Sequence, residues 1–367
     1  MKVICDKKHI SQKVTICQKA INNKSSNDIL KCFLIQAKNG VVKLISYDLD
    51  MAIETTIEAQ IIKEGVIAVN ARLFGDIVRK LPDTLIEIEI DLQNNIFIKY
   101  ENSKFEIKGH SPDEFPKLPE VKKNNLHSIS QNVLKNMIKQ TVFAISQDST
   151  KQILMGELLE ITNNKVSLVA IDGYRLAVRS YSINKNFDDI KIIIPGKNLN
   201  DLNSLLSTEG VVEIGFDDKN AIFIFDNIKM IIRLLEGDFI DYKKLLPREH
   251  NTKIKVNTKD FLNSIERASL LSQSDKNNLI KLSIREKIVA ITSNTDKGNV
   301  YEEVQISLEG DYLDIAFNSR YLIEGLRNIE SEYIYLEFTT NINPCIIKPI
   351  EDIEYNYLLL PVRITSN

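Results

Sequence analysis

Two aspartates separated by one residue are the first side chains whose types and spacing could do chemistry. Asp48 and Asp50 follow a strand-like segment, and carboxylates this close together could hold a divalent metal for phosphoryl transfer. The equivalent positions further along the chain are Asp172 with Tyr174 and Asn294 with Asp296. Since the carboxylate pair is not kept there, acids that stabilise turns are the favoured interpretation. A metal-dependent phosphoryl-transfer enzyme using Asp48 and Asp50 is an alternative hypothesis.

The other residue types that carry catalysis or metals are scattered. The cysteines and histidines are Cys5, Cys17, Cys32, Cys345, His9, His110, His127 and His250. Without short-spaced pairs, the cysteines are predicted to be reduced packing residues rather than disulfides or zinc ligands. The sequence contains no glycine-rich phosphate loop, nucleophile elbow or Ser/His/Asp arrangement. We therefore expect no cofactor, no metal and no catalytic residues.

A turn flanked by an aromatic ring and a planar cation is a better candidate for binding. Asp172-Gly173 is a strong turn former between two strand-like segments, and Tyr174 and Arg175 follow it directly. A plain hairpin explains the turn. Tyrosine and arginine are, however, enriched where one protein grips another, so a binding site is the second interpretation.

The segment Tyr357–Ile364 is apolar on both faces of its predicted strand, whereas a half-buried strand alternates. Leu358, Leu360 and Val362 share one face, and Pro361 restricts the segment to an edge or a strand end. That face needs cover from outside its own domain. A neighbouring domain and an apolar peptide in an open groove are both possible covers.

The elements that position these residues repeat about every 125 residues, which is the length of a whole domain. Three sets of equivalent positions mark the repeat: Asp48, Asp172 and Asn294 at strand ends; Arg72, Lys197 and Arg320 at helix starts; and Phe115 with Phe239 before the domain exits. Short polar linkers near Pro119–Asn125 and Arg248–Asn251 give the predicted domains 1–122, 123–249 and 250–367.

Each repeat is predicted to contain one pattern twice: a strand, a helix and three strands. In the first repeat the predicted strands are Lys2–Asp6, Phe33–Ala37, Val41–Tyr47, Ala52–Ala59, Gly65–Val69, Leu85–Asp91, Asn95–Tyr100 and Lys104–Lys108. The predicted helices are Ser11–Asn22, Ala71–Leu81, Gln131–Ile145, Lys197–Leu206, Lys259–Leu271 and Ser319–Asn328. This order predicts an α+β fold of three similar domains, each with two helices on one side and two small antiparallel sheets.

Charge is sorted between these elements. The six helical segments, taken with their flanking residues, carry a net charge of +8, although the whole chain carries −3. The strands and loops are therefore acidic. Such a chain presents a basic face if its helices share one side, although solvated helices are often basic without any such role.

Composition is that of an ordinary globular protein, with 43% hydrophobic and 26% charged residues. The segment Met1–Asp6 alternates with polar residues and lacks an apolar signal-type core. No apolar run approaches the roughly 18 residues that would span a membrane. A cytoplasmic protein without a membrane segment is expected.

Taken together, these residues resemble the bacterial DNA polymerase III beta subunit, the DNA sliding clamp, over essentially the whole chain. The most specific segments are 172–177, 239–247, Phe317-Asn318 with Tyr321, and 360–363. The resemblance implies a non-enzymatic processivity factor: a head-to-tail homodimer of six domains in a ring, with helices lining the hole around duplex DNA. A scaffold of repeats that forms no ring is a further alternative.

The resemblance also implies three sets of functional residues. The dimer seam would involve Phe105, Ile107, Leu270 and Leu271. The candidates for facing DNA, without sequence preference, are Lys24, Arg72, Arg79, Lys80, Lys135, Lys139, Lys197 and Arg320.

The third set is a groove for a short linear motif of the replicative polymerase alpha subunit, the clamp loader and other partners. It comprises Leu154, Gly173, Tyr174, Arg175, Leu176, Ile240, Lys244, Leu245, Asn318, Tyr321, Leu358, Leu360, Pro361, Val362 and Arg363. Ile171, Ile240 and Lys244 depart from the residues usual in the family, which bears on the peptide preferred.

Overall fold

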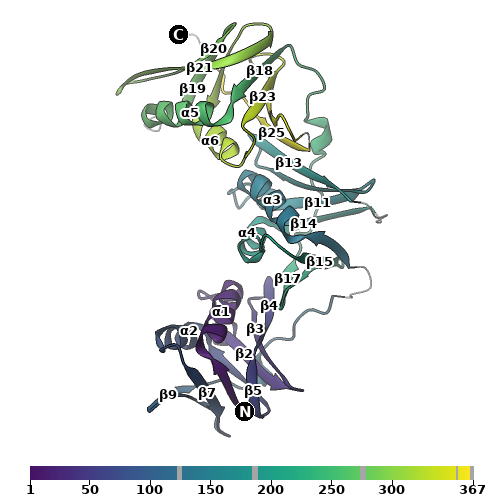
Figure 1. The fold of residues 1–367 in the computed structure, drawn as a ribbon. Coiled ribbons are helices and arrows are strands. Elements are labelled where there is room, and N and C mark those ends of the chain that lie inside the picture. Colours follow the sequence, from purple (N-terminus) through teal and green to yellow (C-terminus); the bar gives the residue numbers. More distant parts are fainter. Residues whose placement is uncertain (122–125, 184–188, 273–277, 353, 364–367) are drawn as a thin grey trace. The chain divides into compact units, whose positions relative to one another are not determined.

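Figure 1 shows the fold in a computed structural model that describes residues 1–121, 126–183, 189–272, 278–352 and 354–363. The chain packs into two compact units. One comprises Met1–Leu134 with Asp201–Leu234, and the other comprises Lys135–Asn200 with Leu235–Asn367. No helix within the described residues is long and apolar enough to cross a membrane.

Six α-helices form in the described residues, each within the segment predicted for it or overlapping it. They are α1 Lys7–Cys17, α2 Ala71–Lys80, α3 Gln131–Thr141, α4 Gly196–Leu205, α5 Thr258–Ser272 and α6 Ser319–Leu326. The helix Ser11–Asn22 was predicted too late in the sequence. Helix α1 begins earlier because Oδ1 of Asp6 accepts hydrogen bonds from the backbone N–H groups of Lys8 and His9, at 2.8 and 3.3 Å.

The strands of the first repeat follow the predicted order. They are β1 Lys2–Asp6, β2 Cys32–Lys38, β3 Val41–Tyr47, β4 Met51–Ile57, β5 Ala59–Lys63, β6 Gly65–Asn70, β7 Leu85–Ile90, β8 Asn95–Tyr100 and β9 Ser103–Lys108. The predicted strand Ala52–Ala59 was wrong at its end, because β4 stops at Ile57 and a further strand, β5, begins at Ala59 and pairs with β1 instead.

The other two repeats have the same order. The second contains β10 His127–Ser130, β11 Gly156–Thr162, β12 Lys165–Ile171, β13 Arg175–Ser182, β14 Ile190–Pro195, β15 Val211–Phe216, β16 Asn220–Phe225 and β17 Ile228–Arg233. The third contains β18 Thr252–Asn257, β19 Leu279–Ile284, β20 Ile288–Thr295, β21 Gly298–Gly310, β22 Leu313–Asn318, β23 Tyr333–Phe338, β24 Cys345–Pro349 and β25 Tyr355–Leu359. All strand pairs in these sheets are antiparallel, as predicted.

The small sheets join across repeats. Strand β17, which ends the second repeat, pairs with β4 of the first and completes an eight-stranded sheet. Strand β25, which ends the third repeat, pairs with β13 of the second within a twelve-stranded sheet. A five-stranded sheet of the first repeat ends at β9. The last strand of a repeat is therefore the element that links it to the repeat before.

Helices pack in pairs on the sheets. Helices α1 and α2 lie side by side in the first repeat, as α5 and α6 do in the third (Figure 1). Their apolar residues are buried: Val14 of α1, Phe74 of α2, Phe261 of α5 and Leu322 of α6 are fully covered. This burial leaves the charged side chains of each helix on its outer face.

One carboxyl group is fully buried among these elements. Glu157 on β11 has no exposed surface, and Thr141 at the end of α3 donates a hydrogen bond to its Oε2 at 2.9 Å. Burial raises the pKa of Glu157 to about 8, and the Thr141 hydrogen bond only partly opposes this shift. The folded protein therefore holds a proton here that the unfolded chain releases at lower pH.

Replacing Glu157 with Gln should remove a pH-dependent loss of stability. The pKa of Glu157 is about 8 in the folded state and near 4.5 in the unfolded chain. Unfolding at a pH between these two values therefore releases a proton. The free energy of unfolding should thus fall by about 2–4 kcal/mol as the pH rises from 5 to 8 in the wild type. Urea denaturation of Glu157→Gln should lack this component, and the exposed Glu309→Gln should retain it. Parallel pH profiles for wild type and Glu157→Gln would contradict the assignment.

Candidate partner-binding groove

An apolar cavity of about 280 Å³ opens where β12, β13 and β25 meet the segment 240–245. Eight predicted groove residues line it: Gly173, Tyr174, Arg175, Leu176, Ile240, Leu245, Leu358 and Leu360. Two further residues complete the lining, Ile171 and Pro344. Ile171, which departs from the residue usual in the family, was not among the predicted groove residues. Pro344, in the loop before β24, was missed because nothing in its sequence context marks it.

Strand pairing places the two apolar walls together. Leu176 on β13 lies opposite Leu358 on β25, although they come from different repeats. Both side chains are buried, and Leu360 just beyond β25 remains partly exposed. The second apolar face of the C-terminal segment is thus covered in part by the neighbouring repeat and also forms a wall of the cavity.

The turn before β13 is built by an aspartate. Oδ1 of Asp172 accepts hydrogen bonds from the backbone N–H groups of Tyr174 and Arg175, at 2.8 and 3.1 Å. Gly173 has φ of +98°, a left-handed conformation that favours glycine. The turn holds the Tyr174 side chain outward, with 59% of its surface exposed.

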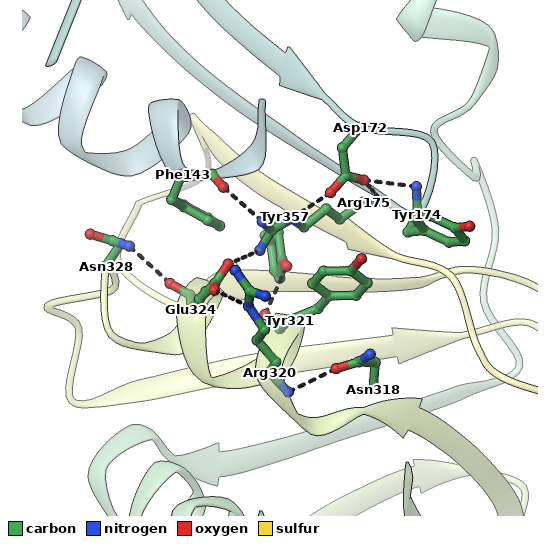
Figure 2. Close-up of polar contacts among 10 residues, drawn as sticks. All are labelled: Phe143, Asp172, Tyr174, Arg175, Asn318, Arg320, Tyr321, Glu324, Asn328 and Tyr357. Carbon is green, nitrogen blue, oxygen red and sulfur yellow. Dashed lines mark hydrogen bonds and ion pairs between the residues drawn. The ribbon is translucent and has the colours of Figure 1, made fainter. Parts of the chain in front are cut away.

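Arg175 is the buried anchor beneath this turn (Figure 2). Its Nε donates to Oδ2 of Asp172 at 3.0 Å, and one terminal nitrogen donates to the carbonyl oxygen of Phe143 at 2.8 Å. The other terminal nitrogen pairs with Glu324 of α6. The guanidinium carbon also lies 4.5 Å from the ring centroid of Tyr321. One side chain therefore ties together the turn, the segment that follows α3 and helix α6.

The charges around Arg175 are mutually stabilised. Burial by itself would lower the pKa of Arg175, but Tyr357 and the carboxylates of Glu324 and Asp172 raise it. Burial would likewise raise the pKa of Glu324, whereas hydrogen bonds from Arg320 and Arg175 lower it. Glu324 is therefore an ionised bridge between a buried arginine and an exposed one, with Arg320 Nε at 2.7 Å.

Two tyrosines form the polar rim of the groove. The rings of Tyr174 and Tyr321 stack with centroids 6.0 Å apart and planes 23° from parallel. Tyr321 is held from behind, because the hydroxyl of Tyr357 donates to its carbonyl oxygen at 2.8 Å. This pair presents aromatic surface next to the apolar walls.

The other predicted groove residues surround the cavity without lining it. Leu154 packs against the buried cluster that contains Leu176 and Leu358. Asn318 caps α6 through a hydrogen bond from the Arg320 N–H. The remaining members are Tyr321, described above, the exposed Lys244, paired with Asp241 at 2.9 Å, and Pro361, Val362 and Arg363 at the end of the described chain. The backbone N–H of Val362 donates to Ala316.

The basic residues predicted to face DNA lie on helices, except for Lys24, which lies in a turn a few residues after α1. Arg72, Arg79 and Lys80 are on α2, Lys135 and Lys139 on α3, Lys197 on α4 and Arg320 on α6. Several are paired within the chain: Arg79 with Asp76 at 2.6 Å, Lys139 with Glu330 at 2.9 Å, and Arg320 with Glu324. These pairs reduce the charge that the helices present.

The predicted seam residues lie on two exposed elements. Strand β9 is the edge of its sheet, and Phe105 there is 38% exposed, with Ile107 on the same face half-buried. Leu270 near the end of α5 is 72% exposed, and Leu271 is half-buried. Exposed apolar side chains on an edge strand are unusual unless another chain covers them.

The Asp48 site has the structure of a turn. Oδ1 of Asp48 accepts hydrogen bonds from the backbone N–H groups of Asp50 and Met51, at 3.1 and 2.7 Å, as Asp172 does in the second repeat. Among the residues that the structure describes, no group of three or more His, Cys, Asp or Glu could hold a metal. The four cysteines are free and buried, as predicted.

We compared the chain with models of known protein families. Three family models, all described as the DNA polymerase III beta subunit, match in order: the N-terminal domain at residues 1–119, the central domain at 128–241 and the C-terminal domain at 243–363. The chain belongs to the DNA polymerase III beta subunit family. The beta subunits of this family are the sliding clamps that act as processivity factors in DNA replication, so the resemblance found from the sequence is confirmed.

Named relatives agree with the family. The beta sliding clamp of Staphylococcus epidermidis is 35% identical over 356 residues, covering 94% of each chain. That of Halalkalibacterium halodurans is 34% identical and covers 99% of this chain and 100% of its own. The crystal structure of the DNA polymerase sliding clamp from Bacillus subtilis matches at a TM-score of 0.97, with 32% identity and full coverage of both chains. The predicted fold class is confirmed, and neither alternative function is supported.

Removing the Arg175 side chain should cost far more stability than removing a neighbouring arginine. Arg175→Ala removes the ion-pair partner of Asp172 and leaves Glu324 paired with Arg320 alone, so the free energy of unfolding should fall by about 3 kcal/mol. Arg179→Ala, on the same strand, breaks a more exposed pair with Asp352 and should cost about 1 kcal/mol. Urea denaturation followed by circular dichroism measures both, and equal losses would show that Arg175 is no special anchor.

Proposed function

We propose that two copies of this chain close head to tail into a ring around duplex DNA and tether the replicative polymerase for processive synthesis. The three clamp domains are taken as residues 1–122, 123–249 and 250–367, and the protein works in the cytoplasm. The single observation that carries the proposal is the match of all three beta-subunit domains in order along the chain. In this role the protein has no catalytic site and acts by topology.

The groove between β13 and β25 is the proposed docking site for the polymerase alpha subunit, the clamp loader and other partners. Its walls are apolar and suit the aliphatic and aromatic anchors of a short peptide. The stacked tyrosines and the buried Arg175 hold a fixed rim, so a peptide meets a preorganised surface.

The basic helices are the proposed DNA-facing elements. A ring that slides must not bind tightly, because each neutralised phosphate adds about 0.9 to the salt dependence of binding. Charges on helices act across water over about 8 Å at physiological salt. Cations already paired within the chain, such as Arg79 and Lys139, fit this weak attraction without sequence preference.

The repeats themselves support the head-to-tail seam. Strand β17 ends the second repeat and pairs with β4 of the first, and β25 ends the third and pairs with β13 of the second. The equivalent strand of the first repeat is β9, and the equivalent of β4 and β13 in the third is β21. Each of these strands has one unpaired edge. In the described chain, β9 has β8 as its neighbour, and residues 298–305 of β21 have β20 as theirs. A second copy can satisfy both edges.

The same equivalence predicts the register of that seam. Lys229 lies opposite Glu54 where β17 meets β4, and Met230 lies opposite Ile53. Counted from the hairpin turns, Lys104 of β9 is equivalent to Lys229 of β17, and Glu302 of β21 is equivalent to Glu54 of β4. Opposite charges would therefore meet again at the seam. Phe105 would then lie opposite Tyr301, which is 62% exposed in the single chain.

A topological test distinguishes a ring from an electrostatic binder. The protein is placed on nicked circular DNA by a bacterial clamp loader and challenged with high salt. We expect the protein to stay on the circle and to leave within minutes once the DNA is cut, because a ring escapes only through ends. Gel filtration of the DNA-bound fraction measures retention. Prompt loss from intact circles, or retention on linear DNA with free ends, would contradict the proposal.

A cross-linking test checks the seam and its register. Phe105→Cys with Tyr301→Cys should give a covalent dimer when a short bismaleimide is added, because directly opposite Cβ atoms lie about 5 Å apart. Phe105→Cys with Glu302→Cys is the matched control, since neighbouring side chains of a strand point to opposite faces. The natural cysteines are buried and should not react. Equal cross-linking of both pairs would contradict the register, and a monomer by light scattering would contradict the seam.

A further inference from the structure

A second cavity of about 390 Å³ lies next to the groove and is not used by the proposed peptide anchors. Leu158 of β11 and Ile193 of β14 form part of its lining, with Phe239 and Ile240 from the segment that follows β17. Ile240 lines both cavities and is 44% exposed. The two openings are therefore neighbours, with Ile240 between them.

Both cavities open over one apolar face of the same sheet. In register, Ile193 of β14 lies opposite Leu158, and Leu158 lies opposite Val169 of β12. Val169 in turn lies opposite Val178 of β13, on the face that carries Leu176. Leu158, Ile193, Leu176 and Leu358 belong to one buried cluster, against which Phe239 packs. The second cavity is thus the continuation of the groove across the sheet.

Two lysines at the polar end of the second cavity, Lys191 and Lys243, offer hydrogen-bond donors to a ligand. Glu160 is buried, and its oxygens accept hydrogen bonds from Tyr242 at 2.8 Å, Lys243 at 2.8 Å and Lys191 at 3.3 Å. Burial alone would raise the pKa of Glu160, but these three partners lower it, so the carboxylate is ionised and fully used. The side chains of Lys191 and Lys243 are 69% and 57% exposed.

We propose that this second cavity binds an acidic extension of the same partner peptide, with its carboxylate held between Lys191 and Lys243. The proposal rests on the proposed function of the groove. Each ammonium group has three donors, and a single carboxylate partner leaves donors free for a ligand. Asp241 at the cavity is paired with Lys244 at 2.9 Å, so its charge is balanced. The exposed Asp238 is the one lining carboxylate that would oppose such a ligand.

Strand spacing sets the distance between the anchors and the acidic group. Three strand steps separate β13 from β14 in the sheet order, which is about 15 Å. An extended peptide advances about 3.3 Å per residue, so the acidic group should lie about five residues from the apolar anchors. Because an extended peptide can cross the sheet in either direction, the test includes extensions at both ends of the anchors.

The test uses a fluorescein-labelled peptide with two leucines and a phenylalanine as anchors, and fluorescence polarisation as the readout. Versions extended by about five residues at either end finish in Glu-Glu or in Gln-Gln. With the extension at one of the two ends, we expect the Glu-Glu version to bind the full-length protein about fivefold more tightly than the Gln-Gln version. High salt should remove this difference in affinity. Lys191→Gln with Lys243→Gln should abolish the advantage and leave the unextended peptide unaffected.

A variant with the opposite expected effect controls for loss of binding through loss of structure. Asp238→Asn should strengthen Glu-Glu binding, because it removes a repulsive charge without touching Glu160. Equal binding of Glu-Glu and Gln-Gln in both directions, or a preference that survives the double lysine substitution, would overturn the proposal. Leu360→Ala should weaken all versions alike, because it removes a wall of the first cavity. If the unextended peptide fails to bind the wild type, the groove itself is wrong and its extension falls with it.

Discussion

The constraint on which this structure depends is that every repeat ends in a strand whose free edge must be covered. An exposed edge presents unpaired backbone groups and recruits other strands. Here β17 and β25 satisfy their edges on the preceding repeat, and sheets of eight and twelve strands result. The strand that ends the first repeat, β9, pairs with β8 and has its other edge unpaired among the described residues. In the proposed ring, a second copy covers this edge by the same pairing rule that joins the repeats within one chain.

The groove is a consequence of one of these junctions. Pairing of β25 with β13 brings Leu358 beside Leu176, and the turn before β13 then lies over helix α6. Arg175 fills the space beneath the turn and neutralises Asp172 and Glu324. Removing water from three charged groups is costly unless they satisfy one another, and they do so here through direct ion pairs. Rigidity at the rim thus follows from burial of charge, whereas the walls follow from strand pairing.

Much of this architecture could be predicted from sequence because it is periodic. The helix positions followed apolar spacing, and Asp48 and Asp172 were correctly predicted as turn acids from their repeated context. Contacts between distant segments carry no such signal. Glu324 lies 149 residues from Arg175, and nothing near either residue indicates that they meet. The break between β4 and β5 was missed for the same reason, since it reflects which neighbouring strand each half pairs with.

The two junctions within the chain have equivalent strand pairing, but different segments cover them. This difference is the reason for placing the proposed docking site at the second junction. At the first junction, Ala52 and Ile231 occupy the positions of Leu176 and Leu358. They pack with Val121 and Leu118 from the linker, which fill the space over the sheet.

At the second junction the following segment contributes Phe239, Tyr242 and Leu246 to the cluster but leaves a cavity of about 280 Å³. A partner at the first junction would have to displace buried apolar side chains and expose those beneath them. Such displacement costs roughly 25 cal/mol for each Å² of apolar surface returned to water. The segment that follows each junction, rather than the sheet, therefore determines whether a cavity remains there for the proposed peptide.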